Sequence, residues 1–212
     1  NAAYNLESSK EVMVLVKKYP EMYAVVGLHP ENISEDFDYT IFDSLDKKIV
    51  GIGEIGLDYH YTKDNKDKQI EIFELQLNIA EKLNLPVVIH SREAAGDTLE
   101  VLKKHHNFGV IHSFSGSLEM AKEYIKLGFV LGVNGVVTFK NCNLSDTLKN
   151  IDINSIILET DSPYLTPVPF RGTQNNPAKM MNTAKFVADI YGVSLSELAK
   201  ITNQNIKRIF DI

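Results

Sequence analysis

The sequence predicts an α/β fold built on a parallel sheet. Short apolar runs alternate with longer helical patterns along the chain, which is the pattern of βαβ units. The predicted strands are apolar on both faces, as strands covered by helices are. Each strand also ends in a polar group, which favours a TIM (β/α)8-type barrel over an open sheet, because the strand ends of a barrel converge on one face.

The predicted strands are apolar runs bounded by glycine, proline or polar residues. They cover Met22–Leu28, Ile49–Glu54, Pro86–His90, Gly109–His112, Phe129–Val133 and Ile156–Glu159. The polar residues at or just past their carboxyl ends are, in chain order, His29, Glu54 with Asp58 close behind, His90, His112, Asn134 and Asp161. No glycine-rich phosphate-binding loop follows the first strand, which argues against a nucleotide-binding open sheet.

The predicted helices show apolar residues at spacings of three and four. They cover Lys10–Tyr19, Asp38–Lys47, Lys66–Leu83, Thr98–His105, Leu118–Leu127 and Leu144–Asn150, and two more follow an irregular loop over Asp161–Pro177. In the longest helix, the predicted buried stripe consists of Ile70, Phe73, Leu77 and Ala80. The last helix is expected to begin at a capping box, Ser194-x-x-Glu197.

Length and composition indicate one globular domain over residues 1–212, with 44% hydrophobic residues and a formal net charge of −6. No run reaches the roughly 18 apolar residues of a membrane helix. The single cysteine, Cys142, cannot form an internal disulfide, and no signal peptide is visible, so we expect a cytoplasmic protein. The acidic balance argues against a broad basic surface that holds duplex DNA.

The polar strand ends suggest metal-assisted hydrolysis. Two histidines and a glutamate are a standard ligand set for a catalytic divalent ion that keeps a position for water. The ion acidifies that water, and a carboxylate such as Asp161 can bind metal or accept the proton. Two ions roughly 3.5–4 Å apart would clamp a phosphodiester, with a carboxylate such as Glu54 bridging them.

A structural interpretation competes with this one. A single histidine is more often a hydrogen-bonded structural residue than a ligand, and Glu54 and Asp161 could cap helices or pair with cations. Charged groups next to buried strands are disfavoured unless they are paired or bind metal. Four such groups, each just beyond an apolar run, therefore favour a metal site.

Seven sequence strings carry a family resemblance. They are VGLHP at 26–30, GIGEIGLDY at 51–59, PVVIHSR at 86–92, IHSFSG at 111–116, VTFKN at 137–141, LETDSPYL at 158–165, and Arg171-Gly172. In this order and spacing they resemble the TatD family of metal-dependent hydrolases, a branch of the amidohydrolase-like barrels. The strings span nearly the whole chain.

The resemblance implies a deoxyribonuclease-type phosphodiesterase that uses two divalent ions (Zn, Mg or Mn). It implies that Glu54 is the bridging carboxylate and that His90 and His112 are ligands of one ion. Asp161 would be a ligand of the other ion and the proton acceptor. His29 resembles a substrate-contacting residue.

Three cations are candidate phosphate contacts. A guanidinium can pair with two phosphate oxygens at once, which suits Arg92 and Arg171. Lys140 is a third candidate. The alternative for all three is a solvated surface charge.

One feature of the family pattern is missing. The family opens with a strand that carries an Asp-x-His-x-His-type motif, and this chain has no His-x-His. The chain therefore resembles a member without its N-terminal strands, with about six of eight. We expect one well-formed metal site, from Glu54, His90 and His112, a poorer second site, reduced activity, and self-association through open barrel edges.

The sequence-based hypothesis is thus a divalent-metal-dependent hydrolase that cleaves phosphodiester bonds of DNA, as an exonuclease on a strand end or short oligonucleotide. Water on the metal would attack phosphorus, with Asp161 as proton acceptor. The alternatives are an amidohydrolase-, lactonase- or phosphotriesterase-type hydrolase of a small molecule, and an inactive fragment that keeps only the fold. No membrane and no obligate protein partner are expected.

Overall fold

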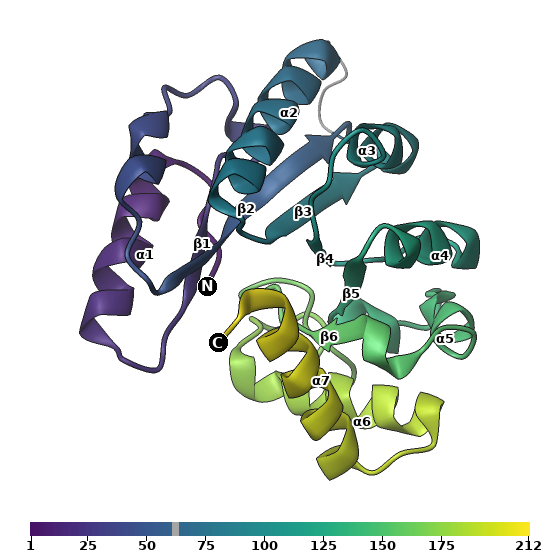
Figure 1. Ribbon diagram of the computed structural model, residues 1–212. Coiled ribbons are helices and arrows are strands. Elements are labelled where there is room, and N and C mark those ends of the chain that lie inside the picture. Colours follow the sequence, from purple (N-terminus) through teal and green to yellow (C-terminus); the bar gives the residue numbers. More distant parts are fainter. Residues whose placement is uncertain (61–63) are drawn as a thin grey trace. The chain divides into compact units, whose positions relative to one another are not determined.

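A computed structural model describes residues 1–60 and 64–212 (Figure 1). Its helices are α1 Leu6–Lys18, α2 Lys66–Leu83, α3 Ala95–Leu102, α4 Leu118–Lys126, α5 Leu144–Leu148, α6 Met180–Tyr191 and α7 Leu195–Phe210. Its strands are β1 Ala24–Val26, β2 Ile49–Asp58, β3 Val87–Arg92, β4 Gly109–Ile111, β5 Phe129–Val133 and β6 Ile156–Leu158. Short 3-10 helices are η1 Pro30–Asn32, η2 Tyr39–Ser44, η3 Gly135–Thr138, η4 Ile153–Ser155 and η5 Pro177–Lys179.

The strands follow one another in chain order, β1-β2-β3-β4-β5-β6. The pairs β1–β2, β2–β3 and β5–β6 are parallel, and a helix or helical turn lies between successive strands in the sequence. The predicted parallel α/β architecture is therefore confirmed. In the described part of the chain the order is linear, with β1 and β6 as its end strands.

The chain divides into two compact units, Asn1–Val110 and Ile111–Ile212. The first unit holds β1 to β3 with α1 to α3, and the second holds β5 and β6 with α4 to α7. Since β4 spans residues 109–111, it includes the point where the units meet in the sequence. Within the described residues, no helix is at once long and apolar enough to cross a bilayer.

Helix α2 covers the first unit's sheet with a buried face that is apolar except for two glutamines. Phe73, Leu77 and Ala80 are fully buried, as predicted, whereas Ile70 is only half-buried. Gln69 and Gln76 are buried with them. Their amides bind backbone groups of other segments, so burial costs them no hydrogen bonds.

Each buried glutamine holds one segment that leads to the candidate site. The amide of Gln76 accepts from Leu28 N (2.8 Å) and donates to Leu28 O (3.0 Å), next to His29. The amide of Gln69 does the same at Asp58, with 2.8 Å to both backbone atoms. The spacing of seven residues puts both glutamines on one face of α2.

Two elements differ from the sequence prediction. The predicted helix over Asp38–Lys47 is the shorter 3-10 helix η2, capped by the Asp38 side chain, with Phe42 as its buried residue. Strand β2 does not end at Glu54 but continues to Asp58. It continues because its second half pairs with β3 through Arg92.

Candidate metal centres

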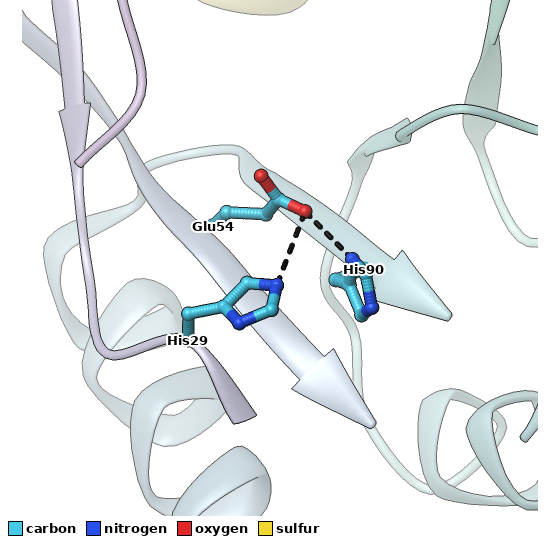
Figure 2. A group of neighbouring side chains, drawn as sticks. All are labelled: His29, Glu54 and His90. Atoms are coloured by element: carbon cyan, nitrogen blue, oxygen red, sulfur yellow. Dashed lines mark hydrogen bonds and ion pairs between the residues drawn. The ribbon is translucent and has the colours of Figure 1, made fainter. Parts of the chain in front are cut away.

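The first unit brings His29, Glu54 and His90 together at the sheet (Figure 2). His29 follows β1, Glu54 lies within β2, and His90 lies in β3. The Glu54 Oε1 atom is 2.8 Å from His90 Nδ1 and 3.5 Å from His29 Nε2. The two imidazole rings meet edge to face with their centroids 4.3 Å apart. One carboxylate oxygen thus lies between two imidazoles, all partly accessible to solvent.

The orientation of His29 is set by its own backbone neighbourhood. Its Nδ1 accepts a hydrogen bond from the Glu31 backbone N–H at 3.2 Å, at the start of η1. A neutral imidazole that accepts at Nδ1 carries its proton on Nε2. His29 therefore presents an N–H donor toward Glu54.

Asp58 supports His90 from the other side of the ring. Its Oδ2 is 2.8 Å from His90 Nε2, and its Oδ1 accepts from the His60 backbone N–H at 2.8 Å. Only 2% of the Asp58 side chain is exposed, against 17% for Glu54. Asp58 is therefore the inner support of His90, and Glu54 is the carboxylate that a ligand can reach.

This pair of carboxylates controls the charge of His90. Burial alone would lower the pKa of His90, but its hydrogen bonds to Asp58 and Glu54 outweigh burial and raise the pKa to about 9. Burial likewise opposes ionisation of Asp58, yet the bonds from His90 and from the His60 backbone keep the pKa of Asp58 below its ordinary value. Without metal, His90 is an imidazolium between two carboxylates, and a divalent ion would displace its proton.

The second unit brings His112, Glu159 and Asp161 together. His112 follows β4, and the two carboxylates follow β6. The His112 ring lies between them, with Nδ1 2.8 Å from Glu159 Oε2 and Nε2 2.7 Å from Asp161 Oδ1. Because a carboxylate only accepts, the proton in the first contact belongs to His112.

Glu159 is held on both oxygens. Besides His112, it accepts from the Ser113 backbone N–H, 2.5 Å from its Oε1. Gly132 makes room for it, since a Cβ at that position would lie 2.5 Å from Glu159 Oε2. Ser113 and Asp161 both have positive φ, 48° and 54°, which is costly for residues other than glycine and is often found at functional sites.

The predicted metal ligands thus fall into two groups, one in each unit. Glu54 and His90 lie together with His29, and His112 and Asp161 lie together with Glu159. Sequence reasoning expected one well-formed set, whereas each unit holds three candidate ligands whose donor atoms lie within 4.8 Å of one another. The assignment of Glu54, His90 and His112 to one ion stays a prediction.

The sequence interpretation gave no role to Asp58 or Glu159. The signal for Asp58 is a second acidic residue four positions after Glu54. The strand register shifts at Glu54, yet both carboxylates contact the His90 ring. For Glu159 the signal is its spacing of two from Asp161 just past an apolar strand.

The predicted phosphate contacts are exposed side chains. Arg92 ends β3 in the first unit, and its charge helps lower the pKa of Asp58. In the second unit, Arg171 packs over the Phe139 ring, 3.9 Å from guanidinium carbon to ring centroid. Lys140 follows that same phenylalanine in the sequence and is exposed.

Comparison with known sequences shows which proteins the chain is related to. A family model described as TatD related DNase matches residues 1–211. An uncharacterized metal-dependent hydrolase of Bacillus subtilis, YabD, is 39% identical over 208 residues, which cover 94% of this chain and 82% of YabD. A second one, YcfH of Escherichia coli, is 38% identical over 192 residues, which cover 88% of this chain and 72% of YcfH.

A solved structure agrees with the sequence comparison. The TatD homologue YJJV of Escherichia coli superimposes with a TM-score of 0.93 at 29% identity, and the match covers 100% of this chain and 85% of YJJV. Both candidate metal centres are built from residues in the matched region. The chain belongs to the TatD family of metal-dependent hydrolases.

Proposed function

We propose that this chain hydrolyses phosphodiester bonds of DNA, at a strand end or in a short oligonucleotide, with the help of divalent ions. The observation that carries the proposal is the pair of histidine–carboxylate clusters, His29–Glu54–His90 and His112–Glu159–Asp161. Imidazole and carboxylate are the donors that zinc and manganese sites use. One carboxylate beside each histidine fixes its ring, Asp58 for His90 and Glu159 for His112. These residues therefore fit a divalent ion.

A divalent ion bound here would acidify a water molecule and neutralise charge on a phosphate. The side chains supply the remaining functions. Asp161 is the proposed proton acceptor, since its carboxylate is 20% exposed while its orientation is held by His112. Glu54, whose Oε1 faces both imidazoles of its cluster, is the proposed carboxylate ligand there, and its role as a bridge between two ions stays a prediction.

Substrate binding is assigned to the remaining predicted residues. His29 is the proposed substrate contact, through the Nε2–H that faces Glu54 when no ion is bound. The guanidinium of Arg171 is stacked on Phe139 and keeps its N–H groups available for bidentate pairing with phosphate. Arg92 and Lys140 are proposed as further phosphate contacts. The net charge of −6 favours a strand end in a local pocket over a long duplex.

The test uses single-stranded oligonucleotides labelled at either the 5′ or the 3′ end, incubated with Mn²⁺, Mg²⁺ or Zn²⁺ and with a chelator. We expect metal-dependent, stepwise shortening from one end. Parallel assays with a lactone and a phosphotriester test the small-molecule alternative. Turnover of those esters without cleavage of DNA would overturn the proposal, and so would metal binding without any hydrolysis.

A further inference from the structure

Asn134 lies beside the second cluster. It follows β5 and is only 3% exposed. Its Oδ1 accepts from the Val136 backbone N–H at 3.0 Å and so caps the 3-10 helix η3. That bond fixes the orientation of the amide, and its NH2 group faces the Ser113 hydroxyl at 2.7 Å and Asp161 Oδ2 at 3.3 Å.

These contacts close a ring of hydrogen bonds. Glu159 contacts His112 at 2.8 Å, and His112 contacts Asp161 at 2.7 Å. Asp161 and the Ser113 hydroxyl both contact the Asn134 amide, and the Ser113 backbone returns to Glu159 at 2.5 Å. All members lie in the second unit. Asn134 thus links Asp161, the proposed metal ligand, to Ser113, whose backbone N–H supports Glu159.

An amide N–H is suited to hold Asp161 without competing for a cation. Asn134 cannot turn its oxygen toward the cluster without losing the cap on η3, so it presents only donors there. With Oδ1 facing His112 and Oδ2 facing Asn134, the Asp161 carboxylate cannot rotate freely. Such support usually orients a ligand and tunes its affinity for metal.

We propose that Asn134 is a positioning residue that fixes the Asp161 carboxylate for metal binding and proton acceptance. This inference rests on the proposed function of the cluster. It assigns no contact with substrate or metal to Asn134 itself. Its action is through Asp161.

The first test compares Asn134→Asp with Asn134→Ala in the full chain. The aspartate keeps an acceptor for Val136 N–H but replaces the donor to Asp161 with a like charge. We expect kcat for oligonucleotide cleavage to fall about 10-fold or more in both variants, with KM within twofold of wild type. The buried like charge should also lower the melting temperature of Asn134→Asp, so kcat is compared with stability in every variant.

Thr138→Val is the matched control. Thr138 lies in the same 3-10 helix and bonds Gly135 O at 2.7 Å and Val168 N at 2.9 Å, outside the ring. We expect this variant to lower the melting temperature and leave kcat within about threefold of wild type. If kcat follows the melting temperature equally in all three variants, or if Asn134→Asp keeps wild-type kcat, the inference is wrong.

A second readout needs no nuclease activity. In a His90→Ala background, Mn²⁺ binding measured by calorimetry reports the second cluster. We expect Asn134→Ala to weaken that binding about 10-fold, and Thr138→Val to leave it unchanged. Equal affinity with and without Asn134 would overturn the inference. A weakened affinity in a protein that does not cleave DNA would overturn the proposed function alone.

Discussion

The two clusters share one arrangement of side chains, with the two nitrogens of the histidine exchanged. In each, a histidine ring lies between two carboxylates at hydrogen-bond distance. His90 has Glu54 at Nδ1 and Asp58 at Nε2, both at 2.8 Å. In the second cluster, the proposed ligand Asp161 lies at Nε2 of His112 and the supporting Glu159 lies at Nδ1. Each ring therefore turns a different nitrogen toward the proposed ligand.

The comparison also separates the two roles a carboxylate can have. Asp58 and Glu159 each bond a histidine with one oxygen and accept from a backbone N–H with the other. Glu54 and Asp161 are the carboxylates that we propose as ligands of a cation. The supporting residue follows its partner by four positions in the first cluster and precedes it by two in the second. Sequence spacing alone thus does not reveal the role.

The largest expected effect comes from neutralising the two proposed ligand carboxylates, Glu54 and Asp161. Glu54→Gln and Asp161→Asn should each lower kcat on the order of 1,000-fold, because a bound ion contributes several kcal/mol to the transition state. Calorimetric metal titration should show one ion lost in each variant. Glu100→Gln, at a side chain 69% exposed on α3, controls for the charge change and should leave turnover unchanged. Retention of a tenth of wild-type turnover by either variant would contradict the assigned roles.

A smaller effect is expected from the supporting carboxylates. Asp58→Asn and Glu159→Gln keep the size of each side chain but weaken its hold on the histidine. Metal affinity should fall about 10- to 100-fold, with the number of bound ions unchanged. If either variant instead loses an ion completely, that carboxylate is a ligand, and the distinction between support and ligand fails in that cluster.

A glycine faces a carboxylate of the second cluster. Gly132→Ala would push a methyl group into the Glu159 carboxylate, at 2.5–2.7 Å from its three terminal atoms. We expect overpacking to cost about 1–3 kcal/mol of unfolding free energy, with weaker metal binding at His112. In Gly96→Ala, by contrast, the new methyl group meets nothing within 4 Å, so helix α3 should be as stable or slightly more so. Equal unfolding midpoints for the two variants would rule out the clash.

A last expected effect is a pH dependence of stability in the first cluster. The folded-state pKa of His90 is raised to about 9 from an ordinary 6.5, so the metal-free protein gains stability from the imidazolium below pH 6.5. That gain is lost as the pH rises through 9. Chemical unfolding in chelator at pH 6.5 and 9 should show this loss in wild type and a smaller one in His90→Gln. The same loss in both would assign the pH dependence to other groups.

Much of the fold could be predicted because its signals are local. The limits of α2, Lys66–Leu83, follow from its apolar periodicity and agree with the structure. The far end of β2 could not be predicted, because Gly53 and Gly56 interrupt the apolar run. Gly56 is there because its neighbour on β3 comes close: a Cβ would lie 2.0 Å from His90 O.

The residue types at the candidate site could be predicted from the sequence, but the contacts between them could not. Polar residues at strand ends identified Glu54, His90, His112 and Asp161, since each breaks an apolar pattern. The supports Asp58, Glu159 and Asn134 are defined by bonds between segments distant in the sequence. The roles of Gln69 and Gln76 could not be predicted for the same reason. Each is a polar residue on a buried face, and its partner is the backbone of another element.

The two buried glutamines of α2 have a consequence for how the first cluster moves. Each amide bonds both the N–H and the C=O of one residue, Leu28 or Asp58, as a neighbouring peptide group would in a sheet. The two glutamine amides thus make the hydrogen bonds of a neighbouring strand at two points, about 10 Å apart along the helix axis. The backbone beside His29 and the backbone of Asp58, which supports His90, are therefore both bonded to the same helix. If α2 opens, both backbone segments should be released at once, so the amide protons of Leu28 and Asp58 should exchange with solvent together.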